Sequence, residues 1–187
     1  MGTNLGNWLN PEGYMFKFSK TNSPRFINEM FCQLVGPDFT AEFWKAFKDN
    51  YIIREDIQFI KNTGANTIRL PFHYKLFTDE DFMGLTAGQD GFARVDSVVE
   101  WCREADLYLI LDMHDAPGGQ TGDNIDDSYG YPWLFESEAS QQLYCDIWRK
   151  IADRYKNEPV ILGYELFNEP IAPYFPNMEE LNGKLED

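Results

Sequence analysis

The chain has 187 residues, 43% of them hydrophobic and 16% aromatic, which is enough for one globular domain with its own core and excludes a disordered protein. Its 31 acidic and 16 basic residues give a net charge of −15, which disfavours nucleic acid and anionic membranes as partners because both would be repelled. Its 3 cysteines are too few and too scattered for a disulfide framework or a zinc site.

The periodicity of the apolar residues predicts strands that alternate with helices along the chain. Gly64 is typical of a helix C-cap, and Pro71 is expected to end the second strand because proline cannot donate to a sheet. A loop that contains Pro11, Gly13 and Pro24 follows the first strand. In chain order, the predicted elements are a strand over 3–9, a helix N-capped by Thr40, a helix over 54–63, a strand over 65–70, a helix over 92–105, a strand over 107–113, a helix over 140–155 and a strand over 160–167.

Four strands separated by helices predict a parallel sheet with right-handed crossovers. An open doubly wound sheet and a (β/α)8 barrel both fit this pattern. No Gly-x-Gly-x-x-Gly follows the first strand and no P-loop is present, so a nucleotide-binding sheet is disfavoured. A barrel has eight strands in typically about 250 residues, so this chain would supply about four of its β/α units.

Polar side chains gather where the predicted strands end. They are Arg69 in the second strand, His114 at the end of the third, and Asn168 and Glu169 after the fourth. The C-terminal ends of parallel strands form one rim, where barrels carry out their chemistry, so we expect these four side chains to lie close together. Arg69 needs a carboxylate or a substrate to be stable inside an apolar strand, and either Glu165 or Asp112 would serve as its structural partner.

Four segments in this order resemble the N-terminal half of glycoside hydrolase family 5, the group of cellulases, mannanases and related β-glucanases. They are Gly-Thr-Asn-Leu-Gly-Asn-Trp-Leu at 2–9, Asn-Thr-Ile-Arg-Leu-Pro at 66–71, Leu-Ile-Leu-Asp-Met-His at 109–114 and Asn-Glu-Pro at 168–170. Asn-Glu-Pro alone is a weak signal, but the ordered set is specific and covers nearly the whole chain. The resemblance implies an α/β fold, a (β/α)8 TIM barrel of which residues 1–187 supply about the first four β/α units.

The family mechanism is retaining hydrolysis by two glutamates about 5–5.5 Å apart. By resemblance, Glu169 is the general acid/base and Asn168 binds the sugar 2-hydroxyl. Arg69 would keep the nucleophile ionised, and His114 would line the subsite at the scissile bond. The resemblance implies no cofactor, and the acidic stretch 123–127 does not match the spacing of a calcium loop.

The family nucleophile belongs to strand seven, beyond the four strands predicted here. We therefore expect no nucleophile in this chain, and no hydrolysis without the C-terminal half of the barrel. That half would come from a longer polypeptide or from a second chain. Glu165 lies on the same side of its strand as Glu169 but deeper in the barrel, and is expected to be structural.

The expected substrate is a β-linked glucan or a related plant or microbial polysaccharide. The loop at 116–122 is similar to that of exo-β-1,3-glucanases, whereas 6–9 is shared more widely with endoglucanases, so endo and exo action both stay open. β-Mannanase or another hemicellulase activity, a non-catalytic carbohydrate-binding half-barrel and a cofactor-dependent oxidoreductase barrel are the alternatives. The expected substrate-binding residues are Trp8, Glu12, His73, Tyr131 and Trp133, with Tyr174 and Phe175 as further candidates and loop packing as the other reading of the aromatic ones.

No signal peptide or membrane span is recognisable in the chain. A polysaccharide-degrading enzyme of this family is nevertheless expected to be secreted, periplasmic or bound to the cell surface.

Overall fold

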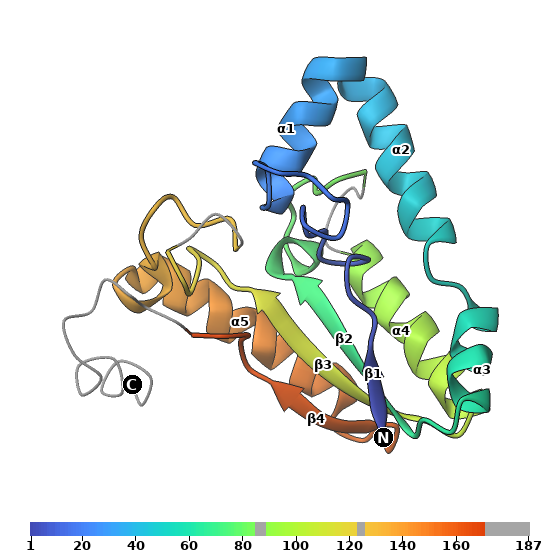
Figure 1. The fold of residues 1–187 in the computed structure, drawn as a ribbon. Coiled ribbons are helices and arrows are strands. Elements are labelled where there is room, and N and C mark those ends of the chain that lie inside the picture. Colours follow the sequence, from blue (N-terminus) through green and yellow to red (C-terminus); the bar gives the residue numbers. More distant parts are fainter. Residues whose placement is uncertain (85–88, 123–125, 171–187) are drawn as a thin grey trace.

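The sheet of the computed structural model is parallel, as predicted. The structure describes residues 1–84, 89–122 and 126–170 (Figure 1). The strands are β1 (Gly2–Asn4), β2 (Thr67–His73), β3 (Tyr108–Asp115) and β4 (Ile161–Glu165). They pair in the order β1-β2-β3-β4, so their C-terminal ends share one edge.

Helices connect these strands, and α4 and α5 lie along one face of the sheet (Figure 1). The helices are α1 (Pro24–Val35), α2 (Pro37–Asn50), α3 (Arg54–Asn62), α4 (Gln89–Glu104) and α5 (Glu138–Tyr155), with short 3-10 turns η1 (Tyr74–Phe77) and η2 (Trp133–Phe135). α1 and α2 form a hairpin that projects beyond the C-terminal ends of the strands (Figure 1). Within the described ranges, no helix combines the length and the apolar character needed to cross a membrane.

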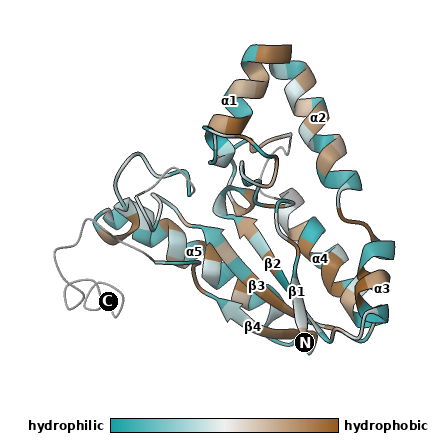
Figure 2. Cartoon of the chain, in the orientation of Figure 1, coloured by the Kyte–Doolittle hydropathy of each residue, from teal (hydrophilic) through white to brown (hydrophobic). Residues whose placement is uncertain are grey.

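The core lies between the sheet and its helices. Alternate residues of a strand face opposite sides, and the fully buried apolar set of β2 and β3 is Ile68, Leu70, Phe72, Leu109, Leu111 and Met113. These pack with apolar residues of α4 and α5, and Figure 2 shows the hydrophobic residues concentrated along β3 and the start of β4. The intervening residues of the same strands, among them Arg69 and Asp112, therefore face the other side of the sheet.

The helical hairpin differs from the prediction at both of its helices. No helix was predicted at α1, and Pro24 was placed in a loop. Ser23, however, accepts a hydrogen bond from the Phe26 N–H, and Pro24 occupies the first helical position, where proline is favourable. Thr40 is not an N-cap, because α2 already begins after Gly36 and the Thr40 hydroxyl donates to the Gly36 carbonyl at 2.8 Å. Gly36, with φ +85°, forms the turn between the two helices.

The second strand runs through Pro71 instead of ending there. The Leu5 N–H donates to the Arg69 carbonyl at 2.9 Å, and the His73 N–H donates to the Leu9 carbonyl at 3.1 Å. Residues 69, 71 and 73 thus direct their main-chain groups toward the first segment of the chain. β1 ends at Asn4, earlier than predicted, so the missing N–H of Pro71 leaves no partner in β1 unpaired.

Candidate active site

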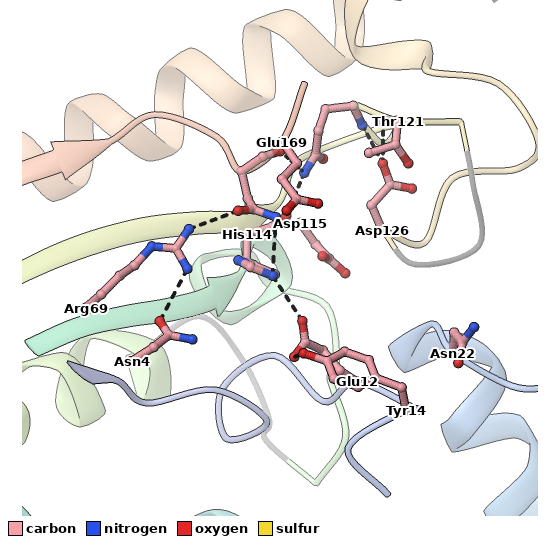
Figure 3. Close-up of a pocket in the computed structure, with 12 residues that line it drawn as sticks. Asn4, Glu12, Tyr14, Asn22, Arg69, His114, Asp115, Thr121, Asp126 and Glu169 are labelled. Carbon is pink, nitrogen blue, oxygen red and sulfur yellow. Dashed lines mark hydrogen bonds and ion pairs between the residues drawn. The ribbon is translucent and has the colours of Figure 1, made fainter. Parts of the chain in front are cut away.

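A polar pocket of about 370 Å³ lies at the C-terminal edge of the sheet (Figure 3). Its side chains come from β1 and the segment after it, from β2 and β3, and from the loops that follow β3 and β4. The lining residues are Asn4, Glu12, Tyr14, Asn22, Arg69, His114, Asp115, Gln120, Thr121, Asp126, Asn168 and Glu169. The four residues expected to meet at the strand ends, Arg69, His114, Asn168 and Glu169, all line this pocket.

Arg69 is the centre of an ion-pair network on the floor of the pocket. Its Nε and Nη2 bind the Glu165 carboxylate at 2.6 and 2.7 Å, and Nη2 also lies 2.9 Å from Oδ2 of the fully buried Asp112. Both partners considered from the sequence are therefore engaged at once. The hydrogen bonds and charge of Arg69 lower the pKa of Glu165, which stays a carboxylate. Nη1 reaches the Asn4 side chain at 3.2 Å.

His114 owes its position to a β-bulge. Phe72 pairs with Met113 but His73 pairs with Asp115, so His114 is an extra residue in β3. Its Nδ1 lies 2.7 Å from Asp112 Oδ2 and its Nε2 lies 3.1 Å from Glu12 Oε1. Although burial lowers the pKa of His114, its hydrogen bonds to the two carboxylates outweigh this effect and raise the pKa to about 10. The imidazolium thus donates one hydrogen bond to each carboxylate.

Asn168 is fixed through both its side chain and its main chain. Its Oδ1 accepts a hydrogen bond from Arg69 Nη2 at 2.9 Å, and its N–H donates to the Met113 carbonyl at 3.2 Å. Because the amide oxygen faces the guanidinium, the amide NH2 group is turned the other way, to 3.4 Å from His114 Nε2. Asn168 therefore presents hydrogen-bond donors beside His114, at the lining of the pocket.

Glu169 follows Asn168 with a left-handed backbone, φ +41°, which is uncommon for a residue other than glycine. Its carboxylate shares the pocket with Glu12 and Tyr14, and the Tyr14 hydroxyl lies 3.2 Å from Glu12 Oε2. Burial and the negative charges of Glu12 and Glu169 raise the pKa of Tyr14. The pocket lining therefore combines the carboxyl groups of Glu12, Asp115, Asp126 and Glu169 with Arg69 and the charged His114.

Two of the expected sugar-binding residues are corrected by the structure, because both are buried and neither lines the pocket. Trp8 packs in the core, where its Nε1 donates to the Lys48 carbonyl at 2.8 Å. The His73 ring stacks with the rings of Tyr74 and Phe82. Rings with so little exposed surface, 1% for Trp8 and 0% for His73, have none left for a sugar.

The remaining expected contacts differ in position. Glu12 lines the pocket beside His114, whereas Tyr131 and Trp133 lie outside its lining. Their rings are 4.9 Å apart, and Trp133 is 44% exposed. Tyr174 and Phe175 lie outside the described residues.

Sequence reasoning did not single out Tyr14, Asn22, Asp115 or Asp126 as pocket residues. Tyr14 and Asn22 belong to the irregular segment before α1, where no periodicity indicates which side chains point inward. Asp115 directly follows His114 at the end of β3, so its position was a signal that could have been used.

His73, Asp115 and Asp127 bring their side-chain ligand atoms close enough together to suggest a metal site. His73 Nε2 lies 3.0 Å from Asp127 Oδ2 and 3.6 Å from Asp115 Oδ2. The Lys75 N–H, however, donates to Nδ1 of His73, so the neutral ring carries its proton on Nε2. Burial lowers the pKa of His73, which favours this neutral form. The Nε2–H then donates to Asp127, and the group is better described as a buried hydrogen-bond network.

The family of the chain follows from a comparison with known proteins. The model of the cellulase family, glycosyl hydrolase family 5, matches residues 27–175. This range covers most of the chain, including the pocket residues of β2, β3 and the loop after β4. The chain belongs to glycoside hydrolase family 5.

Curated relatives of this family 5 chain are named for action on different glycans. It is 32% identical to a beta-xylosidase of Phanerodontia chrysosporium over 92% of its own length, and 37% identical to endoglucanase C of Acetivibrio thermocellus over 70% of it. It is 28% identical to a glucan 1,3-beta-glucosidase of Kluyveromyces lactis over 92%. The chain spans 36%, 36% and 42% of these three proteins, less than half of each.

Solved structures confirm the fold class. A rutinosidase from Aspergillus niger superimposes with a TM-score of 0.72 at 22% identity, over 90% of this chain and 48% of that one. At this identity the likeness shows the fold alone. Together with the parallel sheet, it confirms the predicted α/β barrel architecture, of which the family 5 chain provides about four β/α units.

Proposed function

We propose that this family 5 chain carries the acid/base half of a retaining glycoside hydrolase that acts on β-linked glucan or a related polysaccharide. The observation that supports this most directly is the placement of Glu169, at the strand edge in a pocket with Arg69, His114 and Asn168. The similarity to xylosidase, endoglucanase and glucosidase relatives favours a β-glycoside as the substrate class.

Glu169 would act twice in this mechanism. As an acid it donates a proton to the glycosidic oxygen while a second carboxylate attacks the anomeric carbon; as a base it then accepts a proton from the water that hydrolyses the glycosyl-enzyme. Asn168 would donate its outward-facing NH2 to the sugar 2-hydroxyl, since Arg69 holds the amide oxygen. The positive charges of Arg69 and His114 would favour the ionised form of the second carboxylate.

The second carboxylate would come from the other half of the barrel. We propose that residues 1–187 form the N-terminal half of the catalytic barrel and need the remaining strands, from a longer polypeptide or a second chain, for turnover. The whole enzyme would be secreted, periplasmic or on the cell surface, where its polymeric substrate is found. Tyr131 and Trp133 would stack on sugar rings at an outer subsite, because Trp133 leaves its ring accessible next to the Tyr131 ring.

The test joins this chain to the C-terminal half of a family 5 relative and compares Glu169→Gln with the parent. An acid catalyst matters most when the leaving group is poor, so kcat on unactivated β-glucan should fall about 10²–10⁴-fold. The KM should change little, and release of an activated aryl leaving group should be affected far less. Glu42→Gln, an exposed carboxylate on α2, is the matched control. Unchanged turnover of the unactivated glycan would refute the assignment of Glu169.

A further inference from the structure

Gln120, in the loop after β3, is buried and uses all polar atoms of its side-chain amide. Nε2 donates to the His114 carbonyl at 2.6 Å and to the Asn168 carbonyl at 3.0 Å. Oε1 accepts a hydrogen bond from the Ala116 N–H at 3.1 Å. The side chain therefore joins the end of β3 to the loop after β4, beyond the last paired residues of the two strands.

The loop that carries Gln120 is itself held by a buried carboxylate. Asp126 Oδ2 accepts hydrogen bonds from the main-chain N–H of Gln120 at 2.8 Å and of Thr121 at 2.6 Å. Its Oδ1 accepts from the Ser128 N–H at 3.1 Å. Asp126 thus holds the main chain of Gln120 in place while its side chain contacts the loop after β4. The glycine-rich turn around Gln120 determines where its side chain begins.

The Asn168 main chain is thereby held on both sides. Its N–H donates to the Met113 carbonyl, and its C=O accepts from Gln120. The next residue is Glu169, whose left-handed φ of +41° persists only where the surroundings constrain the backbone. A residue that fixes the Asn168 carbonyl also fixes the peptide that joins Asn168 to Glu169.

We propose that Gln120 is a positioning residue for the acid/base, acting through the Asn168 carbonyl rather than by touching the sugar. Its NH2 group has both hydrogens committed to main-chain carbonyls, so it has no donor left for a ligand. Ionised glutamate has the same shape but no donor, and methionine has a similar length but no donor and only a weak acceptor. The positioning of the loop follows from contacts in this chain; the consequence for catalysis rests on the proposed function of Glu169.

The first test measures amide hydrogen exchange by NMR in the 187-residue chain, with Gln120→Met and Gln120→Glu. Loss of the bond to the Asn168 carbonyl should lower the protection of the Asn168 N–H by about tenfold in both variants. Protection of core amides such as that of Leu111 should stay unchanged, which shows that the variants fold. Gln141→Glu and Gln141→Met, at an exposed position on α5, are the controls. Asn168 protection within about twofold of the parent in a folded Gln120→Met chain would overturn the proposal, and so would an unprotected Asn168 in the parent.

The second test uses the complete barrel described above. Gln120→Met should lower kcat on unactivated glycan about tenfold and leave KM nearly unchanged, because the substrate contacts remain while the acid is misplaced. If Glu169→Gln leaves turnover intact, the acid/base assignment fails while the exchange result still decides the role of Gln120 in holding the loop. If Glu169→Gln lowers kcat and Gln120→Met leaves kcat at the value of the parent, the proposal that Gln120 positions the acid is refuted.

Discussion

Individual residues of the pocket are tied to one another by charge. Arg69 binds two carboxylates and two amide oxygens. His114 bridges Asp112 on β3 to Glu12 on the segment before α1. Since Asp112 is fully buried, its charge depends on these two cations. The chain has 2 histidines, and each lies against two carboxylates, but burial lowers the pKa of His73 whereas hydrogen bonds to Asp112 and Glu12 raise the pKa of His114.

The stability of the chain should therefore depend on pH through both histidines, with opposite signs. The pKa of His114 is raised to about 10 from an unfolded value near 6.5, so its contribution is complete below pH 6.5 and is lost as pH rises through about 10. The pKa of His73 is lowered by burial, so its contribution is complete above pH 6.5 and is lost as pH falls through its folded value.

Urea unfolding as a function of pH checks this. The destabilisation caused by His114→Gln should be largest at about pH 6 and shrink toward pH 10. His73→Gln should instead reduce the loss of stability on the acid side, where carboxylates with a lowered pKa such as Glu165 still contribute. Parallel pH profiles for both variants would contradict the assigned protonation states.

The sequence predicted the gathering of Arg69, His114, Asn168 and Glu169 because their positions follow from one rule, that parallel strands end at a common edge. It could not predict that Trp8 and His73 turn inward, since both lie near strand ends where aromatic rings serve cores and ligands equally well. The sequence offered Glu165 and Asp112 as alternative partners of Arg69. Both are bound at once, because a guanidinium has enough donors for two carboxylates.

At the scale of elements, the predicted strands and helices were found. The errors lie at prolines that were taken to end or interrupt regular structure, and at a threonine that was taken as an N-cap. Pro24 begins a helix, Pro71 sits inside a strand, and Thr40 lies within a helix. For the two helices the deciding feature is a nearby residue, the Ser23 cap before Pro24 and the turn at Gly36 before Thr40. For Pro71 it is the early end of β1, which is distant in the sequence.

The need for glycine at position 36 can be tested by comparison with Gly163, another glycine with room for a side chain. A Cβ at Gly36 or at Gly163 would meet no heavy atom within 4 Å, but only Gly36 has a positive φ, +85°. Gly36→Ala should therefore destabilise the chain by about 1 kcal/mol, whereas Gly163→Ala should be neutral or slightly stabilising. Chemical denaturation of the two variants measures the difference, and equal values would show that α1 and α2 do not need this backbone conformation.

At the scale of the whole molecule, the sheet of the described residues ends at β4. This strand pairs with β3 on one side, and its other edge has no partner among the described strands. Leu162 and Tyr164 are exposed on this strand, and Leu166 is exposed directly after it. An unpaired, apolar edge strand is a template for association with another chain. The expectation of further strands around the pocket comes from the family resemblance alone, since four strands carry no local signal for a fifth.

The isolated chain should accordingly self-associate through β4. Leu162→Lys places a charge on the edge, where Leu162 is 58% exposed, and should increase the monomer fraction in sedimentation experiments. Phe59→Lys, an equally drastic change at an exposed position on α3, should leave association unchanged. An equal effect of both substitutions would point to general solubility instead of the strand edge.

The bulge at His114 determines which side of the sheet each later residue of β3 faces. Strand residues alternate between the helix side and the pocket side, and one extra residue reverses that alternation for the rest of β3 and for the loop it launches. A loop grafted from a protein whose third strand lacks the extra residue would enter the rim rotated to the opposite face. Recombination among relatives at this position should succeed only between parents that both have, or both lack, the extra residue in β3, whatever their overall sequence identity.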